Sequence, residues 1–102
     1  MENNQNAVLI SGRLGADPRF AFTRKGEAVC EMSVGIVNEQ SQTVWRKVVT
    51  FGRLAEQCTV HLRKGCEVFA RGPIVLKTFT NKEGHEKEYL ELKAYSIGQS
   101  LL

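Results

Sequence analysis

Residues 43–65 are the stretch most informative about the fold. They read Thr43-Val-Trp-Arg-Lys-Val-Val-Thr-Phe-Gly-Arg-Leu-Ala-Glu-Gln-Cys-Thr-Val-His-Leu-Arg-Lys-Gly65. The first nine residues are rich in β-branched side chains and predict a strand, which Gly52 then interrupts. From Arg53 to Lys64 the apolar side chains recur with the spacing of an amphipathic helix, at Leu54, Ala55, Cys58 and Leu62. Basic residues in a last turn and a following glycine favour a helix end at Gly65. This stretch therefore predicts a strand, a break and the one convincing helix of the chain.

The segments before this stretch predict further strands. Residues 7–14 form a β-branched-rich run in which Gly12 suggests a bulge or bend, and residues 19–23 could extend the sheet. The next run is apolar at every second position, which is typical of a half-buried strand: Ala28, Cys30, Met32, Val34 and Ile36. Five polar residues, 38–42, then join this run to the Trp45 strand, so we expect an antiparallel hairpin.

The segments after residue 65 predict a second hairpin. Residues 66–79 read as a strand with a bend at Gly72-Pro73, residues 81–85 as a tip, and residues 86–97 as the returning strand. Residues 98–102 are too short to predict an element. Three strands, a helix and a hairpin match an all-β fold, the five-stranded Greek-key barrel of the OB type, with its helix between strands three and four. The pattern alone leaves an SH3-like barrel or a small α+β sheet open.

Length and composition indicate one ordinary soluble domain spanning residues 1–102. The chain is 42% hydrophobic and 25% charged, and its net charge of +3 permits an anionic partner without requiring one. No apolar run approaches the ~20 residues of a membrane span. Residues 1–6 lack the basic and apolar regions of a secretory signal, so we expect a cytoplasmic protein with reduced cysteines.

The Trp45 strand carries the candidate functional residues. Trp45, Lys47, Val49 and Phe51 share one parity and so point to one face of the strand. Aromatic rings that alternate with a cation suit the stacking of bases and the neutralisation of phosphates, which indicates binding of single-stranded nucleic acid. Two alternatives stay open on the pattern: Trp45 could fill the barrel core, and Phe51 could staple the helix.

Other aromatic residues divide into three groups. Phe79 lies near the tip of the second hairpin in polar company, with Lys77 and Lys82 nearby, and we expect it to contact bases. We assign three phenylalanines to the core or to subunit contacts, namely Phe20, Phe22 and Phe69. Tyr89 and Tyr95 share a parity with acids and lysines and receive no assignment.

The sequence favours neither a metal site nor catalysis. Cys58, His61 and Cys66 have spacing that superficially resembles zinc ligands, but no fourth ligand is near, and packed thiols are the better interpretation. Neither histidine is tied by spacing to a nucleophile, and Asp17 is the only aspartate. We therefore expect a protein that is not an enzyme, with no cofactor and no metal.

Four motifs together resemble the bacterial single-stranded DNA-binding protein (SSB) family from about residue 6 to residue 94. They are Val8-Leu-Ile-Ser-Gly-Arg-Leu-Gly-x-Asp-Pro18, Gly26-x-Ala-Val29, Thr43-x-Trp-x-x-Val-Val-x-Phe-Gly-x-Leu-Ala-Glu56 and Leu62-Arg-Lys-Gly-x-x-Val68. Gly72 and Thr78-Phe-Thr-Asn-Lys-Glu-Gly84 also fit. Each motif alone is weak, but their order and spacing make the resemblance specific.

This resemblance implies an OB fold that assembles into dimers or tetramers and binds single-stranded DNA in replication, repair and recombination. It implies base stacking by Trp45 and Phe51, with Phe79 in place of a further stacking residue that is usually tryptophan. It also implies phosphate-facing cations at Lys47, Arg53, Lys64 and Lys77.

The chain departs from the family pattern in three places. The loop at residues 38–43 is short and lacks an aromatic residue, and Arg46 stands where a neutral subunit-interface residue is common, so dimer and tetramer both stay open. The sequence ends at Leu102 without the acidic tip that recruits replication and repair proteins, so we do not expect recruitment through that route. Rival interpretations are a PriB-like primosomal accessory protein, a tailless paralogue from a mobile element or DNA-uptake system, and a domain that binds only proteins.

Overall fold

The structure, a computed structural model, describes residues 7–101; the N-terminal segment expected to lack a secretory signal lies outside them. Within this range the elements are β1 (Ala7–Leu14), β2 (Arg19–Phe22), β3 (Ala28–Val37), β4 (Thr43–Phe51), α1 (Gly52–His61), β5 (Glu67–Thr80), β6 (Glu86–Lys93) and β7 (Ser96–Gln99). None of the helical structure in this range is long and apolar enough to cross a lipid bilayer.

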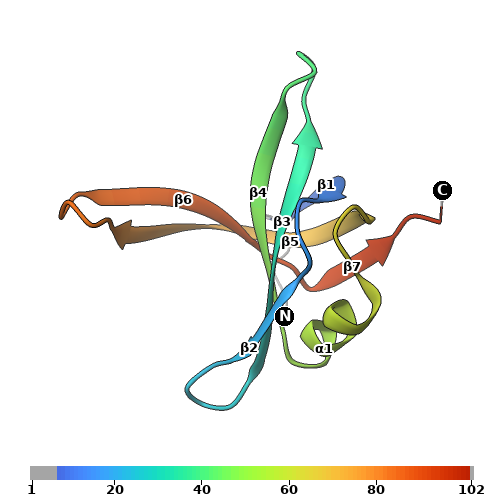
Figure 1. Ribbon diagram of the computed structural model, residues 1–102, viewed down its shortest axis with the longest axis horizontal. Helices are drawn as coiled ribbons and strands as arrows, with labels where there is room; N and C mark the ends of the chain where they lie inside the picture. Colours follow the sequence, from blue (N-terminus) through green and yellow to red (C-terminus); the bar gives the residue numbers. More distant parts are fainter. Residues whose placement is uncertain (1–6, 102) are drawn as a thin grey trace.

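The strands form one sheet that closes into a barrel. Neighbouring strands follow the order β1-β3-β4-β6-β5, and β5 pairs again with β1, which completes a ring of five strands. Of these pairings only β4–β6 is parallel, while β2 attaches to β3 and β7 to β5 at the margin of the ring. The predicted OB-type barrel, with its helix between the third and fourth long strands, is confirmed (Figure 1).

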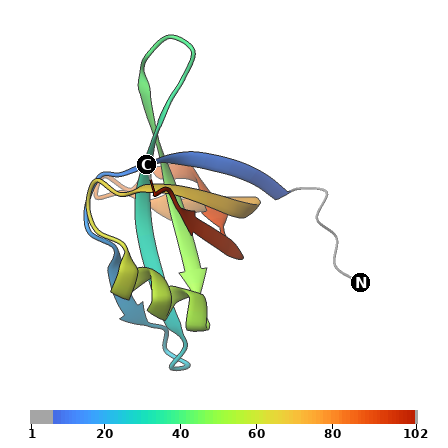
Figure 2. The ribbon, with the colours of Figure 1, turned by 90° about the vertical axis from the view of Figure 1, so that its right-hand side faces the viewer.

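Gly12 lies where β1 passes from one neighbour to another. β1 pairs with β5 from Ala7 to Arg13, and Arg13 also faces Gly35 of β3. A Cβ atom at position 12 would lie 2.1 Å from the carbonyl oxygen of Gly35, far inside van der Waals contact. The backbones of β1 and β3 can approach this closely only because residue 12 has no side chain, and Figure 2 shows the curve of β1 at the edge of the barrel.

The barrel core has the composition expected from the alternating strand. Its fully buried members come from β3, β4, α1, β5 and β6 and include Cys30, Val34, Val48, Ala55, Val68 and Leu92, and the predicted Ile36 packs partly buried against them. α1 covers one end of the barrel, where it packs mainly on β3 and β4 (Figure 2). Its buried residues Ala55 and Cys58 lie on the stripe that the apolar spacing predicted.

Two boundaries differ from those expected from the sequence. The helix ends at His61 because Leu62 has extended backbone angles, so Arg63 and Lys64 do not lie in its last turn. The Arg63 guanidinium nevertheless donates a 3.0 Å hydrogen bond to the carbonyl oxygen of Thr59 and so satisfies a group at the helix end. The returning strand is divided into β6 and β7, and β7 includes Gly98 and Gln99, which were expected to lie outside any element. Both pair with β5, a long-range contact that local pattern does not reveal.

Two long hairpins, β3–β4 and β5–β6, project from the barrel in different directions (Figure 1). An asparagine orders each tip in the same way. The Asn38 side-chain oxygen accepts hydrogen bonds from two backbone N–H groups of its loop, and the Asn81 oxygen does the same in the second hairpin. The second tip carries Lys82, which is exposed.

Candidate nucleic-acid interface

The two faces of β4 have different environments, although Val49 on the outer face is only 4% exposed. Val48 and Thr50 point into the barrel and are 0% exposed, whereas Trp45 on the other face is 55% exposed. Lys47 and Phe51 share the Trp45 face and are partly exposed. Trp45 therefore does not fill the core, and the aromatic–cation–aromatic row predicted for this strand lies on the outer surface of the barrel.

The Trp45 indole rests on a surface of bare backbone. Gly35 is its direct neighbour on β3, and a Cβ atom there would lie 2.9 Å from the ring carbons. A Cβ atom at Gly15 would lie 2.7 Å from the same ring. Both positions need glycine because the ring occupies the space that a side chain would take. The indole is thus fixed over the backbone beside Arg13, and a hollow next to it is lined in part by Arg13, Gly35 and Thr43.

Strand register continues this surface across β6 and β5. Lys47 faces Glu91 on β6, while on the hairpin Lys77 faces Tyr89 and Phe79 faces Lys87. Residues directly opposite one another in paired strands project to the same side of a sheet. The rings of Phe79 and Tyr89 have centroids 5.9 Å apart at an angle of 59°, so the hairpin contributes an aromatic pair to the face that carries Trp45.

Charged groups contact the rings on this face. Lys93 Nζ lies 5.1 Å from the centroid of the Phe51 ring, and Lys47 Nζ lies 5.2 Å from that of Tyr89. Lys47 also forms ion pairs of 3.5 Å with Glu31 and 3.8 Å with Glu91. The face therefore combines aromatic surface with cations, and two carboxylates lie among them.

The structure brings together some of the predicted site residues and separates others. The sheet face holds Trp45, Lys47, Phe51, Lys77 and Phe79. The remaining three are exposed cations outside it. Arg53 is in the first turn of α1, Lys82 is at the tip of the β5–β6 hairpin, and Lys64 follows the helix, where its backbone N–H donates to Asp17.

Sequence reasoning missed Tyr89 and Lys93. Their shared parity with Lys87 was visible, but the acid Glu91 in the same row made the face look mixed. The decisive fact is the parallel pairing of β6 with β4, which aligns Lys93 with Val49, beside Phe51. That pairing joins segments more than forty residues apart, so no local signal could have identified it.

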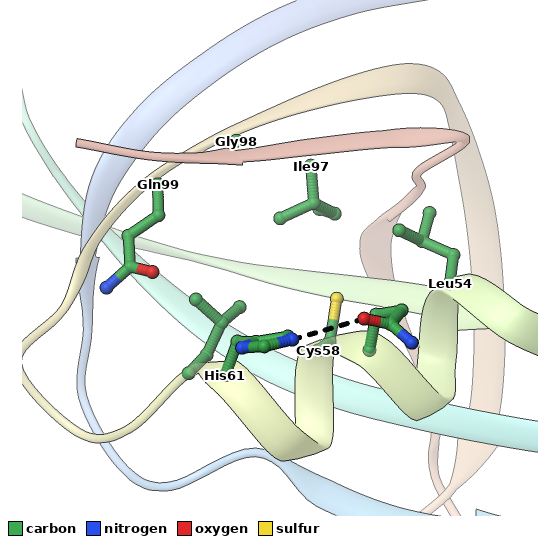
Figure 3. A pocket seen from close by; sticks show the side chains of 8 residues that line it. Leu54, Cys58, His61, Ile97, Gly98 and Gln99 are labelled. Atoms are coloured by element: carbon green, nitrogen blue, oxygen red, sulfur yellow. Dashed lines mark hydrogen bonds between the residues drawn. The ribbon is translucent and has the colours of Figure 1, made fainter. Parts of the chain in front are cut away.

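The cysteines and histidines do not form a metal site in residues 7–101, where no cluster of three or more potential ligands occurs. His61 Nε2 lies 3.1 Å from the Gln57 side-chain oxygen, beside a hollow between α1 and β7 (Figure 3). The Cys66 sulfur accepts hydrogen bonds from the Arg63 backbone and the Gln99 side chain. Burial raises the pKa of Cys30 to about 11 and also raises the pKa of Cys58, as expected of packed thiols.

Comparison with known proteins agrees with this geometry. Residues 5–99 match the model of the single-strand binding protein family, which is almost the whole chain. The chain belongs to that family. Membership of a family of binding proteins supports the prediction that the chain is not an enzyme, and it agrees with the OB-type barrel.

Proteins named single-stranded DNA-binding protein are similar to this member of the single-strand binding family. The protein of Xanthomonas campestris pv. campestris is 32% identical over 92% of this chain and 59% of its own length. That of Xanthomonas axonopodis pv. citri is 32% identical over 92% and 57%, and that of Xylella fastidiosa is 31% identical over 92% and 62%. The chain thus spans about three fifths of the length of these relatives.

Proposed function

We propose that this chain binds single-stranded DNA without regard to sequence, as one OB domain acting in replication, repair or recombination. Bases stack on Trp45, Phe51 and Phe79. Phosphates are neutralised by cations around these rings, namely Arg53, Lys64, Lys77 and Lys82, while Lys47 lies within the same face. Stacking tolerates any base because every base presents a π-face.

A single observation carries the proposal: exposed aromatic rings from β4 and β5 lie on one continuous sheet face with lysines between them. Trp45 is 55% exposed and Phe79 is 48% exposed, although large aromatic side chains usually gain stability by burial. An array of this kind fits an unpaired strand, whose bases are free to stack, and it does not fit duplex DNA, whose bases are stacked on each other. The family to which the chain belongs supports the same conclusion.

Titration of the intrinsic fluorescence tests the proposal, because Trp45 is the single tryptophan of the chain and lies on the proposed face. We expect oligo-dT to quench the fluorescence at low salt, and the quenching to reverse as salt is added, with a slope of about −0.7 per neutralised phosphate in log affinity against log salt. A duplex of equal length should quench far less. Absence of quenching by single strands at low salt would contradict the proposal.

A matched variant controls for the effects of exposed aromatic surface. Phe22 is 65% exposed, but it faces Ala28 on β3 and therefore projects to the core-side face of the sheet. Compared in the same oligomeric state, as checked by light scattering, Phe22→Ala should bind oligo-dT as tightly as the unmodified chain, whereas Phe79→Ala should bind more weakly. Equal losses in both variants would show that exposed rings in general, rather than those of this face, attract the oligonucleotide.

We propose further that the chain forms a homo-oligomer. Three apolar side chains that sequence assigned to the core or to subunit contacts, Phe20, Phe22 and Phe69, are 38–65% exposed, which leaves subunit contact as their use. Leu76 and Leu90 also face each other across the β5–β6 hairpin, 57% and 41% exposed, on the side away from the aromatic pair. The mass in solution by light scattering should exceed that of the 11.4 kDa chain by two- or fourfold. A monomer at micromolar concentration would refute it.

A further inference from the structure

Lys47 lies at the centre of the sheet face, and its ammonium already forms ion pairs with carboxylates of the protein. Its ammonium is 3.5 Å from a carboxylate oxygen of Glu31 on β3 and 3.8 Å from one of Glu91 on β6. The Glu91 side chain is only 10% exposed, and the lysine side chain is 36% exposed. Two carboxylates thus accompany one ammonium, and a phosphate that approached Lys47 would meet their negative charge as well.

Lys77 differs from Lys47 in this respect. It lies on the same face, opposite Tyr89, and it has no ion-pair partner within the described residues. Its side chain is exposed near Phe79. A phosphate can therefore gain the full attraction of the Lys77 charge, whereas at Lys47 the same attraction is offset by Glu31 and Glu91.

Tyr89 is the ring that Lys47 contacts. The ammonium lies 5.2 Å from the centroid of the tyrosine ring, and Phe79 contacts the same ring from the hairpin at 5.9 Å. The two carboxylates fix the ammonium from β3 and β6, so the cation that contacts the ring is itself fixed from two strands. The ring is only partly buried, and it lies between the row on β4 and Phe79.

We infer that Tyr89 is a further base-stacking residue, and that Lys47 is a positioning residue for its ring rather than a contact for phosphate. The inference rests on the proposed function, since it assigns roles within the same face. Glu31 and Glu91 then act through Lys47. Their carboxylates offset the charge of its ammonium and hold the ammonium over the tyrosine ring. A strand that passes from Trp45 to Phe79 would find an ordered ring between them.

Substitution of the tyrosine tests the stacking role. Tyr89→Ala should weaken binding of fluorescein-labelled oligo-dT by about 5- to 150-fold, the range expected for loss of one stacked base. Tyr89→Phe retains the ring and should bind within about twofold of the unmodified chain. Unchanged affinity in a folded Tyr89→Ala variant would overturn the inference.

A crosslinking measurement keeps the inference testable if Tyr89→Ala fails to fold. Irradiation of the unmodified chain with an oligonucleotide that contains 5-bromouracil should give crosslinked peptides that include Tyr89 as well as Trp45 or Phe79. Crosslinks at Trp45 and Phe79 without any at Tyr89 would overturn the stacking role alone. The absence of both crosslinks and fluorescence quenching would instead refute the proposed function. The failure of the inference and the failure of the proposed function can therefore be told apart.

A charge-matched double variant tests the positioning role. Lys47→Met with Glu31→Gln removes one charge of each sign, so the sum of charge in the cluster stays as it was. We expect the salt slope of oligo-dT binding to stay unchanged, while the crosslink yield at Tyr89 falls at least twofold and that at Trp45 does not. Lys77→Met, the positive control, should reduce the magnitude of the slope by about 0.7. A reduction of that size in the double variant would show that Lys47 contacts phosphate and would overturn its positioning role.

Discussion

The two faces of β4 both carry apolar side chains but differ in the kind of side chain and in its exposure. The inner face presents Val48 and Thr50, both 0% exposed, to a core of aliphatic side chains and thiols. The outer face presents Trp45 and Phe51 with a lysine between them. Aliphatic side chains fill the barrel, whereas the aromatic rings of β4 lie outside it and stay partly exposed to solvent.

The exposed side chains of the outer face nevertheless have specific contacts that fix their positions. Trp45 rests on the backbone at Gly15 and Gly35, and Lys47 contacts Tyr89 while paired with two carboxylates. Each exposed ring thus has a fixed support that the core does not need. Fixing exposed side chains costs conformational entropy that burial does not offset, so this order is consistent with the proposed binding role of the face.

The largest effect should come from a charge on the inner face. Val48→Asp places an unpaired carboxylate at a position that is 0% exposed, which costs several kcal/mol against a typical total stability of about 5–15 kcal/mol. We expect the variant to be unfolded, or to unfold at a much lower midpoint temperature when unfolding is followed by circular dichroism. Val44→Asp is the control, because this valine lies on the same strand with the same parity but is 40% exposed. A stable Val48→Asp protein would contradict the assignment of the inner face.

Removal of the indole should separate binding from folding. Trp45→Ala should weaken binding of labelled oligo-dT by about 1–3 kcal/mol, as expected for one lost stacking surface in single-strand-binding OB folds, this family among them. Its unfolding midpoint should change little, because the ring is 55% exposed and makes no contribution to the core. Fluorescence anisotropy of the oligonucleotide measures binding, since the variant lacks tryptophan. Loss of folding would instead assign Trp45 a core role.

A side chain beneath the indole should have a smaller effect of the same kind. Gly35→Val puts a Cβ atom 2.9 Å from the ring, so the ring must shift by several tenths of an ångström or more. We expect severalfold weaker binding and a shifted tryptophan emission maximum, with Trp45 itself intact. Gly26→Ala is a control for glycine replacement, because a Cβ there meets nothing within 4 Å, although its φ of +85° makes alanine strained. The control should lower stability without weakening binding, and weaker binding in both would argue against the backbone support.

The assignment of residues to the inner and outer strand faces could largely be predicted from the sequence. Alternation at Cys30, Met32 and Val34 identified the inner face of β3, and parity placed Trp45, Lys47 and Phe51 together on β4, because strand periodicity is a local property. The helix was also visible, and only its end was wrong. Arg63 and Lys64 satisfy the composition of a last turn equally well when they lie just beyond it.

The rest depends on pairing between distant segments. The parallel register of β4 and β6 brings Glu91 to Lys47 and Lys93 to Phe51, and the pairing of Phe69 with Gly98 makes β7 a strand. Neither partner carries a local signal for the other. The residues next to Tyr89 in the sequence therefore gave no basis for assigning it to the site. For the same reason, the ion pairs of Lys47 with two carboxylates could not be predicted.

The thiols of the inner face should make stability depend on alkaline pH. Burial raises the pKa of Cys30 to about 11 from the 9.0 of an ordinary cysteine thiol, so the unfolded chain loses this proton first as pH rises. The stabilisation is complete below about pH 9 and is lost as pH rises towards 11. Urea unfolding should give a lower free energy at pH 10.5 than at pH 8. Cys30→Ala should be less stable at pH 8 but show a smaller decrease between the two values, since tyrosines and lysines titrate alike in both proteins. An equal decrease would contradict the shift.

The smallest effects should come from the cations outside the sheet face. Arg53 lies in the first turn of α1, which directly follows Phe51, whereas Lys64 follows the helix and its backbone N–H donates a hydrogen bond to Asp17, so both cations lie outside the row of rings on β4. Arg53→Met and Lys64→Met should each reduce the magnitude of the salt slope by about 0.7 and weaken binding only a fewfold, without altering the fluorescence quenching at saturation. Lys25→Met in the β2–β3 turn is the matched control and should leave the slope unchanged. If all three slopes equal that of the unmodified chain, neither Arg53 nor Lys64 contacts phosphate, and the outer face of the sheet together with its hairpin then accounts for the whole binding site.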